Sequence, residues 1–234
     1  MPPILSTRYL PSRCTPLLAL TFVGCTMLNP GVAQLERYQQ ARADGQWEAI
    51  ADDAPVDDCQ PVTEGCAKLY TIYGEANLLL AFASRAADAF CPPPVANGRL
   101  NSAAASFSKS EKFTDLSLTA EAKVKIKALH AQALYCLAEN ASSIEQGMVL
   151  VHQSAAQAAG LPRPDALFWQ AMSHLYLARP GVGTDAQRCA AAHLAGESAN
   201  AARAAGVNDE LSQTLDRVLH DAEQVRRSIA GCME

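Results

Sequence analysis

The chain has 234 residues, a formal net charge of −5 and a hydrophobic content of 49%. This composition predicts a folded protein with a sizeable core and argues against nucleic-acid binding, which requires clustered Lys and Arg side chains. The densest basic run, Lys123, Lys125 and Lys127, alternates with apolar residues and is interpreted as the solvated side of a helix.

Residues 1–24 are predicted to be a secretion signal. Their only charged residues are Arg8 and Arg13, and an apolar stretch follows from Leu17 to Val23. A basic head, a short apolar stretch and a small residue before the cleavage point are typical of signal peptides, and the stretch is too short to span a bilayer. We therefore exclude this segment from the fold prediction.

The end of the signal, Phe22-Val23-Gly24-Cys25, resembles the lipobox of bacterial lipoproteins. The resemblance implies that the Cys25 thiol carries a diacylglycerol and that residues 25–31 form a lipidated tether. Thr26 follows the cysteine. Lipoproteins held in the inner membrane commonly have Asp at that position, so the resemblance implies an outer-membrane anchor facing the periplasm. An ordinary secretory signal, cleaved nearby with Cys25 incidental, is the alternative.

The rest of the chain, residues 32–234, is predicted to be one all-α domain of antiparallel helix pairs, forming either a short right-handed array or a bundle. Apolar residues recur at helical spacing, and strand-like alternation is absent. Charged residues such as Glu75 within the longest apolar helix argue against a membrane span. A capping box at Ser142 and Glu145 predicts a helix to Ala159, and Pro162 introduces the next helix. The other predicted helices span 32–43, 47–51, 67–90, 100–113, 119–139, 185–205 and 209–231.

Two segments suggest repeats. Residues 155–161 recur in similar form at 201–207, and the run from Ala41 to Ile50 resembles the helix–turn–helix of tetratricopeptide (TPR) repeats. The resemblance implies stacked helix pairs with an extended binding surface. As a lipid-anchored helical protein, the chain also faintly resembles the T-component lipoproteins of TRAP transporters, which implies a role beside a transporter.

Six cysteines follow Cys25, and an even number in an oxidising compartment predicts disulfides. In an up-down arrangement, the helices that end near Cys91 and Cys136 end at the same side of the domain, so these cysteines are expected to pair. The last two helices form a hairpin that brings Cys189 beside Cys232. The remaining two cysteines, at the ends of a short loop, are expected to bond to each other: Cys59 and Cys66.

No motif for catalysis, a cofactor or a metal is present. The mature histidines are spread over separate helices, and the acidic loop 52–58 lacks the glycine and closing Glu of a calcium loop. We therefore expect no enzyme, no catalytic residue, no cofactor and no metal. The candidate binding surface consists of aromatic residues: Trp169, Tyr135 and Tyr176.

The predicted function is a protein-binding or scaffold module, held at the outer membrane by its lipid, for an unknown envelope protein. This hypothesis predicts an open groove with exposed aromatic side chains. The alternative is a small-ligand-binding component of a transporter, which predicts a closed apolar cavity or channel that holds a small apolar ligand.

Overall fold

The computed structural model describes residues 30–56, 65–87, 89–113 and 118–232. The predicted signal and the lipidation site Cys25 lie outside the described residues. The predicted tether ends earlier than expected, because Pro30 already begins a helix. Within the described part, no helix combines the length and the apolar character needed to cross a membrane.

The described residues are helical and contain no strand, so the prediction of an all-α fold is confirmed. Most predicted helices are present, with ends that differ by a few residues. Their bounds are α2 Pro30–Ala43, α3 Trp47–Asp52, α4 Gly65–Ala83, the short 3-10 helix η1 Pro94–Ala96, α5 Asn97–Lys112, α6 Ala120–Glu139, α7 Ile144–Ala158, α8 Arg163–Leu177, α9 Asp185–Ala204 and α10 Asp209–Ser228.

Side-chain caps fix where several of these helices begin. The Thr119 hydroxyl accepts the Ala122 amide at the start of α6, and Thr184 forms a capping box with Gln187 at the start of α9. At the start of α7 the cap is Ser143, not the predicted Ser142. The Ser143 hydroxyl accepts the Gln146 amide at 3.2 Å, whereas the Ser142 hydroxyl donates to the Gln146 side chain.

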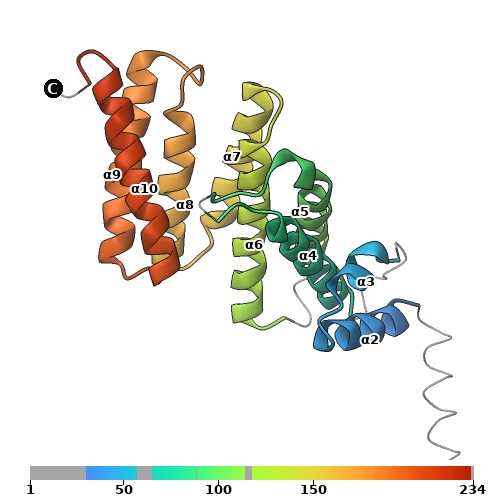
Figure 1. The fold of residues 1–234 in the computed structure, drawn as a ribbon. Helices are drawn as coiled ribbons and strands as arrows, with labels where there is room; N and C mark the ends of the chain where they lie inside the picture. Colours follow the sequence, from blue (N-terminus) through green and yellow to red (C-terminus); the bar gives the residue numbers. More distant parts are fainter. Residues whose placement is uncertain (1–29, 57–64, 88, 114–117, 233–234) are drawn as a thin grey trace, which may run out of the picture.

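The helices pack as consecutive antiparallel neighbours (Figure 1). The closest partners are α4 with α5, α6 with α7, and α8 with α9, while α10 packs on α9. Contacts also skip one helix, from α4 to α6, from α6 to α8 and from α8 to α10. These four helices therefore share one side of the molecule, which we call the inner face. The specific TPR class of this arrangement stays a prediction.

Helix α4 is shorter than predicted. It ends at Ala83, whereas the apolar pattern predicted a helix to Phe90. Residues 84–93, described except for residue 88, instead form an irregular segment that we call the strap. The strap leaves α4, reaches the space between α6 and α8 and returns to α5 (Figure 1). The predicted apolar stripe of α4 does not extend to Phe90, because the Phe90 ring packs against α6 and α8 instead.

Two of the predicted disulfides are confirmed. Cys91 bonds to Cys136 and Cys189 bonds to Cys232, with Cα atoms 5.2 and 5.6 Å apart. The second pair joins the start of α9 to the residues after α10, whereas the first joins α6 to the strap rather than to the end of α4. Cys66 is also disulfide-bonded. Its predicted partner, Cys59, lies outside the part of the chain that the structure describes.

Candidate functional site

The strap crosses the inner face, and Phe90 fixes it there. The Phe90 ring lies 5.9 Å from the Tyr135 ring, 6.0 Å from Phe168 and 6.1 Å from Trp169, centroid to centroid. These partners come from α6 and α8, which are far from Phe90 in the sequence. Mixed edge-on and tilted rings at such distances are favourable aromatic pairs. One side chain therefore holds the strap between two helices.

Polar and covalent bonds secure the strap on its other side. Cys91 is bonded to Cys136 of α6, and the Asn140 side-chain amide donates to the Pro92 carbonyl oxygen over 3.0 Å. The same amide also donates to the Asn97 side chain at the start of α5. Pro93 has the extended backbone that proline favours, with φ −68° and ψ 164°. The strap is therefore a non-helical segment held at three successive residues, Phe90, Cys91 and Pro92.

The predicted binding surface of Trp169, Tyr135 and Tyr176 is corrected by this geometry. Trp169 is 6% exposed, Tyr135 2% and Tyr176 5%, so none can serve as a projecting anchor. Tyr135 and Trp169 pack against Phe90 of the strap. Helical periodicity placed Trp169 off the buried stripe. It could not show that a segment from another part of the chain covers that side.

Two clefts flank the strap on the inner face. One, of about 440 Å³, lies between the strap, α6, α8 and the start of α10. The other, of about 360 Å³, lies between the strap and the opposite ends of α6 and α8. Both include Phe90 and Ala89 of the strap and Arg217 of α10 in their walls. The strap therefore divides a longer groove that follows α6, α8 and α10.

Charged groups in the second cleft form a compact network. Arg179 donates to both carboxylate oxygens of Glu139 at 2.6 Å, and its guanidinium lies 4.7 Å from the centre of the Tyr176 ring. Although burial opposes the charge, Glu139 raises the pKa of Arg179. Burial and the nearby Glu139 charge raise the pKa of Tyr135 well above its usual value. Arg179 therefore stays charged and Tyr135 stays neutral at neutral pH.

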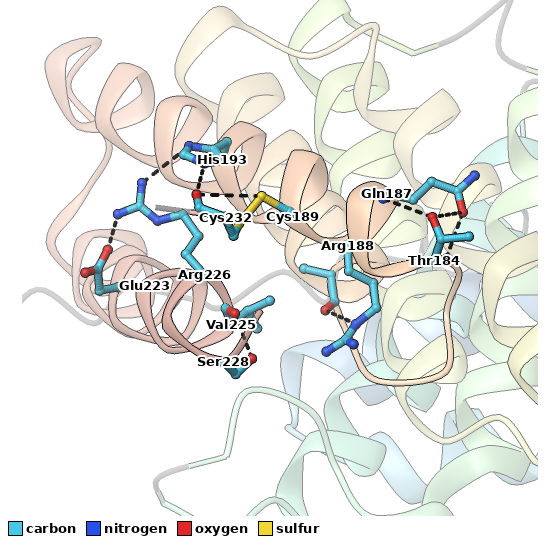
Figure 2. Close-up of a disulfide and its surroundings, with 11 residues drawn as sticks. Thr184, Gln187, Arg188, Cys189, His193, Glu223, Val225, Arg226, Ser228 and Cys232 are labelled. Atoms are coloured by element: carbon cyan, nitrogen blue, oxygen red, sulfur yellow. Dashed lines mark hydrogen bonds and ion pairs between the residues drawn. A yellow bond between two sulfur atoms is a disulfide. The ribbon is translucent and has the colours of Figure 1, made fainter. Parts of the chain in front are cut away.

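Another group of possible ligands surrounds the C-terminal disulfide. The sulfur atoms of Cys189 and Cys232 and a ring nitrogen of His193 lie within 4.8 Å of one another. Figure 2 shows His193 between the Cys232 carbonyl oxygen, 3.0 Å from its Nε2, and Arg226. Metals bind thiolates, and both sulfurs here are committed to a disulfide. While that bond is intact, we interpret the group as structural.

Two histidines line a further cleft between α7, α8 and α9, away from the strap. His152 and His174 line this cleft, of about 580 Å³, together with Glu145. Burial lowers the pKa of His174 below its ordinary value of 6.5, so its ring is neutral at pH 7. The sequence suggested one histidine per helix and did not predict this pair. None of the described residues that line this cleft is Ser, Thr or Cys, so the histidines have no hydroxyl or thiol nucleophile beside them in the lining.

The strap is the functional feature that the sequence prediction missed. Phe90 stood in the sequence as the last member of an apolar stripe, directly before Cys91 and three prolines. A proline run disfavours helix in the residue before it, which explains an end near Cys91 but not the observed end at Ala83. No local sequence pattern indicates that Phe90 inserts between α6 and α8. Compared with protein-family models, curated proteins and solved structures, the chain matches none.

Proposed function

We propose that this protein is a non-enzymatic binding module, lipid-anchored to the outer membrane, whose inner face holds an extended segment of another envelope protein. The strap is the observation that carries this proposal. It is a non-helical stretch of polypeptide that lies across the inner face, with an aromatic side chain inserted between two helices. A surface that accepts one such segment has the shape and the hydrogen-bonding groups to accept another beside it.

The composition of the two clefts supports a protein partner. Their walls combine aromatic and apolar side chains with arginine and amide groups, including Trp169, Arg179, Gln132 and Arg217. Protein interfaces are enriched in aromatic residues and arginine over a partly apolar surface. Pairs such as Glu139 with Arg179 offer both a hydrogen-bond acceptor and further donor hydrogens to a partner backbone. Stacked helix pairs commonly present such extended surfaces.

The alternative function, a small-ligand component of a transporter, predicts a closed apolar cavity. The clefts beside the strap instead open to solvent, and charged residues occur in both linings. This arrangement favours the protein-binding hypothesis for the strap region.

Site-specific photo-crosslinking in intact cells tests the proposed partner. We expect photoreactive residues at Gln132 or Gln213, which line the 440 Å³ cleft, to crosslink one discrete envelope protein. Val95 and Val149 are matched controls, because both are exposed and lie outside this lining, at 87% and 57% exposure. Equal crosslinking from the control positions, or no crosslink from either groove position, would contradict the proposal.

The proposed anchor has its own test. We expect cells fed a clickable palmitate to label this protein, and we expect the change Cys25→Ser to abolish the label and release the protein into the soluble periplasmic fraction. More than one acyl chain is needed for stable anchoring, so loss of the acceptor thiol removes membrane association. The change Cys14→Ser, inside the predicted signal, is the control and should leave the label intact. Labelling that survives Cys25→Ser would refute the lipobox assignment.

A further inference from the structure

A third cleft on the inner face lies between α3, α4 and α6, with a volume of about 360 Å³. It borders the strap cleft only through Leu129 and Gln132, which line both. Its walls are mostly large apolar side chains from three helices: Trp47, Leu78, Leu79, Phe82 and Leu129. The volume is at the lower end of the range of about 300–1,000 Å³ that is typical of small-molecule sites.

Leu79 makes this cleft unusual for a surface. It is 47% exposed although most of α4 is buried, and it stands beside Leu78, which is 5% exposed and closes the floor. Trp47 and Phe82 are partly buried and flank it. A single exposed leucine is ordinary on a protein surface. An exposed leucine inside a concavity walled by two aromatic rings offers a continuous apolar lining to a ligand.

The rim of the cleft carries a surplus of positive charge. Glu75, whose side chain is 12% exposed, accepts from Arg42 at 3.2 Å and from Lys125 at 2.7 Å. Two cations therefore surround one carboxylate, although the whole chain has a net charge of −5. The cations are 44% and 56% exposed, so part of each faces solvent. Lysine has three donor hydrogens and arginine five, so both can bind a second anion while they hold Glu75.

From this juxtaposition we propose that the cleft binds a single-headed anionic amphiphile, a medium-chain carboxylate. The hydrocarbon chain lies along Leu79, Phe82 and Trp47, and the carboxylate head pairs with Arg42 and Lys125. A purely apolar ligand would leave the surplus charge unmatched, and a small hydrophilic anion would leave the apolar walls wet. This site is separate from the strap groove and does not depend on the proposed protein partner.

The positions of the two tryptophans in the chain allow a direct test. Trp47 lines this cleft, whereas Trp169 is buried beside the strap. The Cys25→Ser protein, purified without detergent, would be titrated with ω-bromoundecanoate, because bromine quenches tryptophan fluorescence only at contact range. In a Trp169→Phe background we expect saturable quenching of Trp47 that unbrominated undecanoate reverses. In a Trp47→Phe background we expect Trp169 to be unaffected.

Charge variants test the head group. Lys125→Met should weaken binding by up to about fivefold, since a partly exposed ion pair contributes up to about 1 kcal/mol. Lys123→Met, on the same helix but outside the cleft lining, should bind as the parent does. Absence of quenching in the Trp169→Phe protein, or equal quenching of both tryptophans, would overturn the site. Equal competition by neutral undecanol would overturn the anionic head group.

Discussion

The double change Cys91→Ser/Cys136→Ser should lower the free energy of unfolding by about 4 kcal/mol, the largest loss that we expect from any small change in this protein. The bonded residues are 45 positions apart, and a loop of that length loses about 4 kcal/mol of chain entropy in the unfolded state when it is closed. Cys136 is fully buried, so a serine hydroxyl there adds a desolvation cost. Urea unfolding followed by circular dichroism would measure the difference.

The Cys91–Cys136 disulfide should also fix the position of the strap. Removing the other disulfide is a control that separates this local effect from the loss of overall stability. Cys189→Ser/Cys232→Ser opens a loop of nearly the same length, with a separation of 43 residues, but it lies at the last hairpin, away from the strap. We expect both double variants to lose similar stability. Only the first should speed hydrogen exchange at the amides of Ala89 and Phe90. Equal exchange of the strap in both variants would show that Phe90 packing alone positions it.

Gly147→Ala should destabilise the protein by about 2 kcal/mol, although alanine is the better helix former. A Cβ at Gly147, in α7, would lie 1.8 Å from the Tyr176 hydroxyl and 3.2 Å from the Ala138 carbonyl oxygen. The Tyr176 hydroxyl donates to that same carbonyl, so the ring must move and lose the bond. Overpacking of this kind costs about 1–3 kcal/mol and a lost hydrogen bond about 1 kcal/mol more, against a propensity gain of at most about 1 kcal/mol.

Gly196→Ala is the matched control for this prediction. Gly196 lies inside α9, and a Cβ there would meet nothing within 4 Å. With no clash, the helix preference of alanine should stabilise the protein by about 0.5–1 kcal/mol. Thermal unfolding of the two variants beside the parent gives the comparison. Similar melting temperatures for both variants would mean that α7 shifts away from Tyr176 at little cost.

The sequence determined the elements that depend on near neighbours. The predicted helices 119–139 and 185–205 begin within one residue of α6 and α9, where the hydroxyls of Thr119 and Thr184 cap the first turn. Apolar spacing predicted α10 closely, since one of its faces is buried along its length. The pairing of Cys91 with Cys136 was predicted from the order of helices, with Cys91 placed at a helix end. The bond is confirmed, although Cys91 lies in the strap, beyond the end of α4.

The end of α4 and the burial of Trp169 depended on contacts that no local pattern records. Phe90 has the spacing of the apolar stripe of α4. Local sequence alone therefore predicts that the helix continues to the prolines. Phe90 leaves that stripe because its ring packs better between Tyr135 and Trp169, residues more than 40 positions away. Once the strap covers α6 and α8, Trp169 is buried whatever its position on the helical wheel.

Sequence alone therefore determined the all-α class, most helix bounds and two of the disulfides, because propensity, capping and helix order act locally or topologically. Only the tertiary structure decided the binding surfaces. The strap groove and the cleft around Leu79 are each built from three or more elements, and their shape depends on how those elements pack. Packing is a property of all contacts at once, so the exposure of a side chain cannot be derived from its neighbours in the sequence.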